Sequence, residues 1–316
     1  MTQTMTAAGG GVHAGGMLGS TIAVDRLTKR FGSVLAVDDL SFAVEPGRVT
    51  GFLGPNGAGK TTTLRCLLGL VAPTSGTATI GGHSYPAIPT PARVMGAALE
   101  ATGFHPGRTA RNHLRVLARA GGIDERRCDE VLALVGLDDA RNRAVGGFSL
   151  GMRQRLQLAA ALLGDPGVLV LDEPANGLDP EGIAWLRAFL RHLAGQGRTV
   201  LVSSHMLSEV EQTVDDVVII ARGTLVRACA LSDLTAPSAG VVVRTPNPDA
   251  LTAAITGLAP QASAEAQPDG TLLVHGVDAA DIGRAALAAQ VELHELRAAT
   301  SDLEEVFLSL TSGATS

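Results

Sequence analysis

A glycine-rich run with one lysine and two threonines is the part of this sequence best suited to chemistry. Its residues match the pattern GxxxxGK[ST] in full: Gly54, Pro55, Asn56, Gly57, Ala58, Gly59, Lys60, Thr61 and Thr62. Glycines let backbone N–H groups approach a phosphate, the lysine binds the β- and γ-phosphates, and the first threonine hydroxyl binds Mg²⁺. A glycine-rich turn is the alternative, since the chain has 38 glycines, but its only lysines are Lys29 and Lys60.

Two adjacent carboxylates form the second candidate for a chemical site. Asp172 and Glu173 follow the apolar run 168–171, a pattern that is typical of a buried strand. Ligands of open α/β sheets gather at the carboxyl ends of the strands, so we expect this pair near the glycine-rich run. There Asp172 would bind Mg²⁺ and Glu173 would polarise an attacking water, because phosphoryl transfer depends mainly on positioning and charge neutralisation. The alternative is an acidic pair that only initiates a helix.

The elements that must position these groups alternate between strands and helices. Val49–Leu53 reads as a buried strand that leads into the glycine-rich run, and a helix is predicted from Lys60 to about Leu70. This order of strand, glycine loop and helix indicates a P-loop NTPase of the α/β class, with a mostly parallel sheet covered on both faces. The other predicted strands cover residues 21–27, 40–44, 168–171, 199–202 and 216–220, and the other predicted helices cover 183–193 and 206 to about 214.

Residues outside this alternating region divide into three parts. The first 19 residues are rich in Gly, Ala and Thr and are predicted to be a flexible tail, whereas residues 94–164 are mostly helical in pattern. After about Leu234 the composition shifts to Ala, Pro and Thr, with short strands predicted at Gly240–Arg244 and Leu272–His275 and a helix near 303–310. Residues 236–316 are therefore predicted to form a small α+β appendage, in which no motif carries chemistry.

The composition excludes several classes of protein. With 25 basic and 31 acidic residues the net charge is −6, which gives no support to a nucleic-acid partner. The three cysteines, Cys66, Cys128 and Cys229, show neither metal-ligand spacing nor a disulfide framework, and this favours a reducing cytoplasm. The longest apolar stretch, 156–171, is interrupted by Asp165 and Pro166, so we expect any membrane role to depend on a partner.

The segment between the two chemical motifs narrows the class further. Residues 148–155, Phe-Ser-Leu-Gly-Met-Arg-Gln-Arg, resemble the signature of the ABC-transporter ATPase family, LSGGQ followed by Gln-Arg. Leu150 and Met152 depart from the family pattern, but Ser149 and Gly151 keep it. In that family the serine and glycine contact the γ-phosphate bound on the opposite subunit, and the resemblance implies the same for Ser149 and Gly151. A Ser turn that caps a following helix is compatible with this assignment.

Other motifs follow in the order of the same family. Residues 175–180 resemble the D-loop, which lies at the dimer interface in the family. His205 resembles the switch histidine that senses γ-phosphate, and Phe31 the aromatic residue that stacks on adenine, although an isolated His or Phe is more often structural. Glu100 stands where the family's Q-loop glutamine belongs, and the resemblance assigns it to Mg²⁺ or the attacking water, with an exposed loop acid as the alternative.

The resemblance implies a fold and a subgroup. It predicts an ATP-binding cassette over residues 20–235, in which a P-loop core with a mostly parallel sheet joins an antiparallel β subdomain and a helical subdomain at about 94–164. The stretch 96–114, and more weakly 301–308, resembles bacterial export ATPases of bacitracin- and daunorubicin-type drug resistance systems.

The function implied by the resemblance is ATP hydrolysis that drives export. Lys60, Glu173 and His205 would be catalytic, Thr61, Asp172 and Glu100 would hold Mg²⁺, and two chains would form a homodimer around two ATP molecules. That dimer would drive a separate multi-span permease from the cytoplasm, on the inner face of the cell membrane. The alternatives are a soluble ABC ATPase of translation or DNA repair, which usually carries two cassettes, coiled coils or basic inserts, and a regulatory module that binds ATP without turnover.

Overall fold

The computed structural model describes residues 19–99, 103–205, 211–235, 240–259, 261–267 and 269–299. The chain divides into two compact units, Met1–Ala228 and Cys229–Ser316, and the boundary falls within strand β9 (Thr224–Ala230). Each unit has a hydrophobic core of its own. None of the described helices is both long enough and apolar enough to cross a membrane.

The central sheet of the first unit places the ends of three strands side by side. Its order is β5-β6-β7-β3-β8-β9, and the pairs from β5 to β8 are parallel. Leu53 pairs with Ser204, and Asp172 pairs with Ser203, so the chain leaves these strands at one edge. The first five strands of this order are β5 (Met95–Ala98), β6 (Val168–Asp172), β7 (Thr199–Ser204), β3 (Val49–Leu53) and β8 (Asp216–Ala221).

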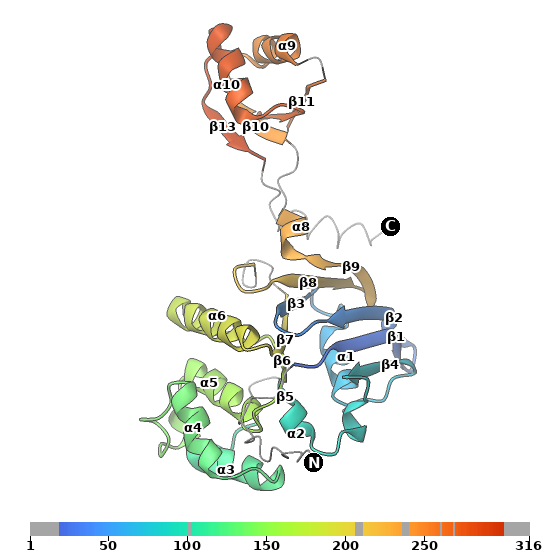
Figure 1. Cartoon of the computed structure of the whole chain (residues 1–316), viewed down its shortest axis with the longest axis vertical. Helices are drawn as coiled ribbons and strands as arrows, with labels where there is room; N and C mark the ends of the chain where they lie inside the picture. The colour runs from blue at the N-terminus through green and yellow to red at the C-terminus, as the bar shows by residue number, and fades with distance from the viewer. Residues whose placement is uncertain are drawn as a thin grey trace, which may run out of the picture. The chain divides into compact units, whose positions relative to one another are not determined.

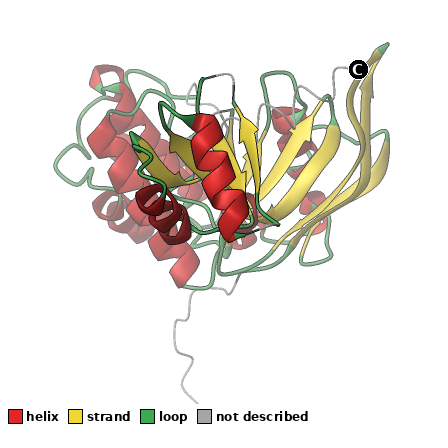
Figure 2. Ribbon diagram, turned by 90° about the horizontal axis from the view of Figure 1, so that it is seen from above, coloured by secondary structure: helices red, strands yellow, loops and turns green. Residues whose placement is uncertain are grey.

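Helices cover both faces of this sheet, as the parallel pattern predicts. In Figure 1, α1 (Lys60–Leu67) lies on one side of the central strands, and α6 (Pro180–Gly195) lies on the other. Strands β3, β6 and β7 are buried along their whole length, because both of their faces are covered. Figure 2 shows the strands and helices from above.

An antiparallel sheet and a group of helices complete the first unit. The sheet has the order β2-β1-β4, with β1 (Ile22–Phe31), β2 (Val34–Val44) and β4 (Ser75–Ile80). The helical part contains α3 (Ala110–Ala120), α4 (Arg126–Leu134) and α5 (Leu150–Ala161), which contact one another. The shorter helical segments are η1 (Tyr85–Ala87), α2 (Pro91–Val94) and η2 (Val145–Gly147).

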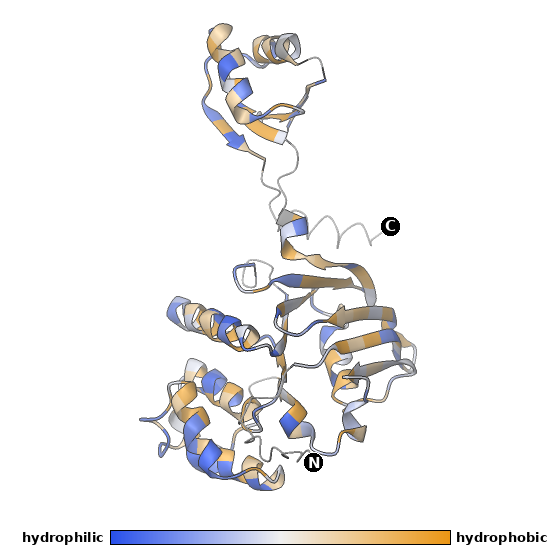
Figure 3. Cartoon of the chain, viewed as in Figure 1, coloured by the Kyte–Doolittle hydropathy of each residue, from blue (hydrophilic) through white to orange (hydrophobic). Residues whose placement is uncertain are grey.

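The second unit has the element order β-α-β-β-α-β and the sheet order β11-β12-β10-β13, which is the ferredoxin-like arrangement. Its apolar side chains, such as Val243, Val274 and Ile282, pack between the sheet and the two helices. In Figure 3, β10 of this unit is coloured as hydrophobic, whereas β13 also carries hydrophilic residues. The elements are α8 (Leu231–Thr235), β10 (Gly240–Arg244), α9 (Pro248–Leu258), β11 (Ser263–Ala266), β12 (Leu272–His275), α10 (Ala279–Ala288) and β13 (Glu295–Ala298).

Several predicted boundaries differ from the structure. The helical pattern expected from residue 94 is wrong at its start, because residues 95–98 form the edge strand β5. The helix from Lys60 ends at Leu67 rather than near Leu70, where the chain turns at Gly69 with φ 66°. Strands β4, β9, β11 and β13 were not predicted. Of the predicted tail 1–19 the structure describes only Gly19, and the predicted helix 303–310 lies outside the described residues. The start of the predicted helix 206–214 also lies outside them, and its end is wrong, because residues 211–213 form a turn rather than a helix.

A substitution at Gly96 tests the close packing of β5 against α5. A methyl group at this position would collide with the backbone carbonyl of Ala161, which cannot move as a side chain can. We therefore expect Gly96→Ala to lower the free energy of unfolding by about 1–3 kcal/mol. Gly195→Ala is the matched control, because it lies at the end of α6 with open space around it and should be neutral or slightly stabilising. Urea denaturation of both variants measures the difference, and equal stabilities would contradict this packing.

Candidate active site

The glycine-rich loop connects β3 to α1 and adopts a conformation that requires glycine. Gly57 and Gly59 have φ values of 82° and 104°, a region that residues with a side chain rarely enter. A Cβ atom on Gly59 would also lie 2.5 Å from the carbonyl oxygen of Ala36. Gly59 is the N-cap of α1, so the loop delivers free backbone N–H groups and the positive end of the helix dipole to one place.

Lys60 is buried at the start of α1, with 6% of its surface exposed. Its Nζ donates hydrogen bonds to the carbonyl oxygens of Gly54 at 2.6 Å and Pro55 at 3.4 Å, and it lies 3.8 Å from Oε1 of Glu173. Burial lowers the pKa of Lys60, while the charges of Glu173 and Asp172 act in the opposite direction. The ammonium is therefore held in place by the loop and charge-balanced by the carboxylates of Asp172, the last residue of β6, and Glu173, which follows it.

Asp172 ends β6 and is buried, with 9% of its surface exposed. Its Oδ2 accepts a hydrogen bond from the Thr61 hydroxyl at 3.1 Å, and its Oδ1 accepts a short one from the Ser203 hydroxyl. The site thus joins one residue each from α1, β6 and β7. Ser203 was not predicted as a site residue, because only the register of β6 and β7 brings it to Asp172.

Glu173 is held through its backbone by Ser203 of β7 and through its side chain by His205, which directly follows β7. Its N–H donates to the carbonyl oxygen and the hydroxyl of Ser203, at 3.2 and 3.1 Å, and its Oε2 lies 2.9 Å from Nδ1 of His205. Its φ of 49° is unusual for a residue other than glycine. Such conformations concentrate at active sites, where the surrounding structure enforces them.

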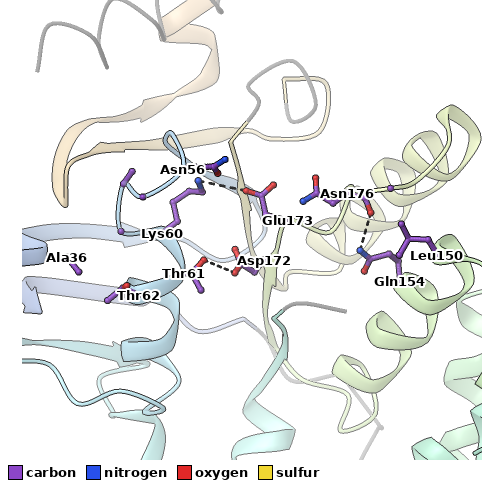
Figure 4. Close-up of a pocket in the computed structure, with 14 residues that line it drawn as sticks. Ala36, Asn56, Lys60, Thr61, Thr62, Leu150, Gln154, Asp172, Glu173 and Asn176 are labelled. Atoms are coloured by element: carbon purple, nitrogen blue, oxygen red, sulfur yellow. Dashed lines mark hydrogen bonds and ion pairs between the residues drawn. The ribbon is translucent and has the colours of Figure 1, made fainter. Parts of the chain in front are cut away.

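These groups face a common cavity of about 550 Å³ (Figure 4). Lys60 and Thr61 point from α1 toward Glu173 and Asp172, and Asn176 lies next to the cavity together with Leu150 and Gln154 of α5 (Figure 4). Most of the glycine-rich loop and both carboxylates therefore meet at one place. The lining residues are Ala36, Asn56, Gly57, Ala58, Gly59, Lys60, Thr61, Thr62, Leu150, Gln154, Asp172, Glu173, Asn176 and Gly177.

Other predicted site residues lie apart from this lining. Phe31 ends β1 with 48% of its surface exposed, and the ammonium of Lys29 lies 4.7 Å from the centre of its ring. Ser149 is the N-cap of α5, where its hydroxyl accepts from the N–H of Met152 at 3.2 Å, and Gly151 follows in the first turn. Glu100 lies outside the described residues.

The donor set of the site fits a magnesium ion better than a metal held by the protein alone. In the part of the chain that the structure describes, no three His, Cys, Asp or Glu residues cluster as ligands. Thr61 and Asp172 instead offer one hydroxyl and one carboxylate next to the phosphate loop. Mg²⁺ is commonly bound by one or two protein oxygens together with substrate phosphates and water.

The amino-acid sequence of the chain is similar to those of known proteins. A family model described as ABC transporter matches residues 37–176. The Bacillus licheniformis "Bacitracin transport ATP-binding protein BcrA" is 48% identical over 202 residues, which is 63% of this chain and 66% of that protein. The Paraburkholderia xenovorans (strain LB400) "Nod factor export ATP-binding protein I" is 35% identical over 302 residues, which is 92% of this chain and 97% of that protein. The chain belongs to the ABC transporter ATP-binding family.

Structural comparison agrees with this family. A solved structure titled "Structure of ATP binding subunit of ABC transporter" superposes with a TM-score of 0.62 at 28% identity, covering 70% of this chain and 92% of that one. ABC ATP-binding cassettes bind ATP and are ATPases, so the chain is an ATPase of this family. Residues 239–304 match a second family model, "Domain of unknown function (DUF8746)".

The substitution Ser203→Ala tests whether Ser203 positions Asp172 in the candidate site. Ser203→Ala removes the donor to Asp172 and one acceptor for the N–H of Glu173. A buried carboxylate oxygen that loses its partner costs about 1–3 kcal/mol, so we expect lower thermal stability and a higher Mg²⁺ concentration for half-maximal ATPase activity. A magnesium titration of the purified protein measures this. Unchanged magnesium dependence and stability would show that Asp172 is positioned without Ser203.

Proposed function

We propose that this chain is the nucleotide-binding subunit of an export system, which dimerises around two ATP molecules and drives a separate membrane permease. The observation that supports the proposal most strongly is the meeting of Lys60, Thr61, Asp172 and Glu173 at one cavity. Cation, hydroxyl and carboxylates in contact are the groups that phosphoryl transfer requires.

Dimerisation is proposed because one protomer leaves the site incomplete. Ser149 and Gly151 are not among the residues that line the cavity next to the protomer's own phosphate loop. The Ser149 hydroxyl and the start of α5 would instead meet a γ-phosphate bound by a second copy. An arrangement in which each copy gives the other the same residues has two-fold symmetry, the commonest symmetry of soluble oligomers.

The chemical roles follow from the contacts of each residue. Lys60 would hold the β- and γ-phosphates, while Thr61 and Asp172 would hold Mg²⁺, which neutralises phosphate charge when bound. Glu173 would position the attacking water and accept its proton, with His205 at 2.9 Å to orient the carboxylate. Phe31, which keeps about half of its surface exposed, would stack on adenine.

The proposal of export rests on relatives. The bacitracin transport and Nod factor export proteins are named as ATP-binding proteins of transport systems, and the second covers nearly all of this chain. A chain of this kind would lie on the cytoplasmic side of the cell membrane, attached through the permease. In our proposal, the permease rather than this chain selects the cargo.

Glu173→Gln tests the proposed hydrolysis. The amide keeps the shape of the side chain but cannot accept a proton, so we expect ATP binding to persist while kcat falls by about 10²- to 10⁴-fold. Gel filtration with ATP and Mg²⁺ should then show a long-lived dimer. Glu181→Gln, at an exposed carboxylate in the first turn of α6, is the control and should hydrolyse ATP as the parent does. Parental turnover in Glu173→Gln would refute this role.

In our proposal, a basic groove on the helical part would be the surface that the permease contacts. It is a hollow of about 470 Å³ along α3, lined by Arg108, Arg115 and Arg119 together with Val116. Arg115 and Arg119 share a single carboxylate, Glu125, at 2.6 and 2.5 Å. The excess of positive charge around an exposed valine favours an acidic, partly apolar segment as the docking element.

Charge reversal tests this docking surface. Arg108→Glu should reduce co-purification with the permease, and the effect should grow when salt is lowered, because the added carboxylate would repel an acidic segment. Arg141→Glu, an exposed arginine outside the groove, is the matched control. If both variants retain the permease equally, the groove is not the docking site.

A further inference from the structure

Leu150 is the residue that the proposed function leaves unexplained. It stands at a position where the resembling family pattern has glycine, directly after Ser149 and at the first position of α5. Nearly half of its surface is exposed, 48%, although leucine is usually buried. A large apolar side chain at this place needs a physical reason.

Leu150 packs on the loop that follows the catalytic carboxylate. Gly177 has φ 74°, and a Cβ atom on it would overlap Cδ2 of Leu150, so the leucine lies directly against the backbone of Gly177. One turn further along α5, the side-chain amide of Gln154 donates to the carbonyl oxygen of Asn176 at 3.3 Å. Figure 4 shows Leu150 and Gln154 on α5 with this hydrogen bond to Asn176.

The contacted loop is tied to Glu173 and to α6. The N–H of Asn176 donates to the carbonyl oxygen of Glu173 at 3.2 Å, so the turn begins at the catalytic residue itself. On the far side, Asp179 caps α6, and the guanidinium of Arg155 in α5 lies 4.2 Å from the ring centre of Trp185 in α6. Contacts from α5 therefore reach Asn176 and Gly177, just after Glu173, and Trp185 in α6.

We propose that Leu150 is a positioning residue whose packing on Gly177 fixes residues 176–177 to the start of α5. We call this packing the lock. It would make Ser149 and Glu173 of one protomer move as one rigid body. This inference rests on the proposed dimer, in which Ser149 meets the nucleotide of the partner while Glu173 acts on the protomer's own. The lock then transmits the state of one ATP site to the other, and a glycine at position 150 would remove the packing and loosen the backbone.

Leu150→Ala tests the lock in the full-length protein. ATP affinity is measured on the isolated protomer at low protein concentration, and kcat and the Hill coefficient for ATP are measured on the dimer. Leu150 lines the same cavity, but its side chain is apolar and offers neither a donor nor a charge to a phosphate, so we expect ATP affinity to stay within about two-fold. The kcat should fall by about five-fold or more, and the Hill coefficient should approach one, because coupling between the sites is lost.

Two further variants separate positioning from a general structural effect. Leu150→Met keeps an apolar side chain of similar volume and should restore both kcat and the Hill coefficient. Leu134→Ala removes a leucine of similar exposure, 43%, at the end of α4, and should behave as the parent. A fall in melting temperature or ATP affinity in Leu150→Ala that matches its loss of kcat would overturn the proposal in favour of simple destabilisation.

Different results would refute the role of Leu150 and the proposed function. If the parent and Leu134→Ala hydrolyse ATP cooperatively and Leu150→Ala does so equally well, the lock is refuted and the transport ATPase stands. A parent that hydrolyses ATP with a Hill coefficient of one also refutes the lock. If the parent and Leu134→Ala both fail to hydrolyse ATP, the proposed function fails first.

Discussion

The structure of the site depends on one buried ammonium group. A lysine with 6% of its surface exposed loses most of its hydration, and such a charge is tolerated only when polar partners replace the water. The carbonyl of Gly54 and the carboxylate of Glu173 supply those partners for Lys60, from the loop after β3 and the end of β6. The glycines of the loop and the pairing of β3, β6 and β7 are the means by which these partners are brought together.

The same constraint explains why the chemical core could be predicted from sequence. A lysine in a glycine-rich loop after an apolar strand has few other uses, and Asp172 and Glu173 follow a strand whose burial is evident from its composition. Because parallel strands end at a common edge, the local pattern sufficed to expect Lys60, Thr61, Asp172 and Glu173 close together. The ferredoxin-like order of the second unit could be expected only as a small α+β fold.

Other features depend on contacts between distant segments, and local patterns do not encode them. Strand β5 is four residues long and pairs only at the sheet edge, so its apolar residues resemble the start of the helical region. Ser203 becomes a partner of Asp172 only through the register of β6 and β7. Leu150 was noted as a departure from a family pattern, but its contact with Gly177 requires the three-dimensional placement of α5.

The effect of Lys60→Met on the affinity of the purified protein for ATP tests the central claim most directly. Methionine fills similar space without charge, so the fold should persist while the phosphates lose their cation. The account predicts that the parent retains ATP in the presence of Mg²⁺ and that Lys60→Met, with a parental melting temperature, does not. Equal retention of ATP by the two proteins, measured by equilibrium dialysis, would contradict it.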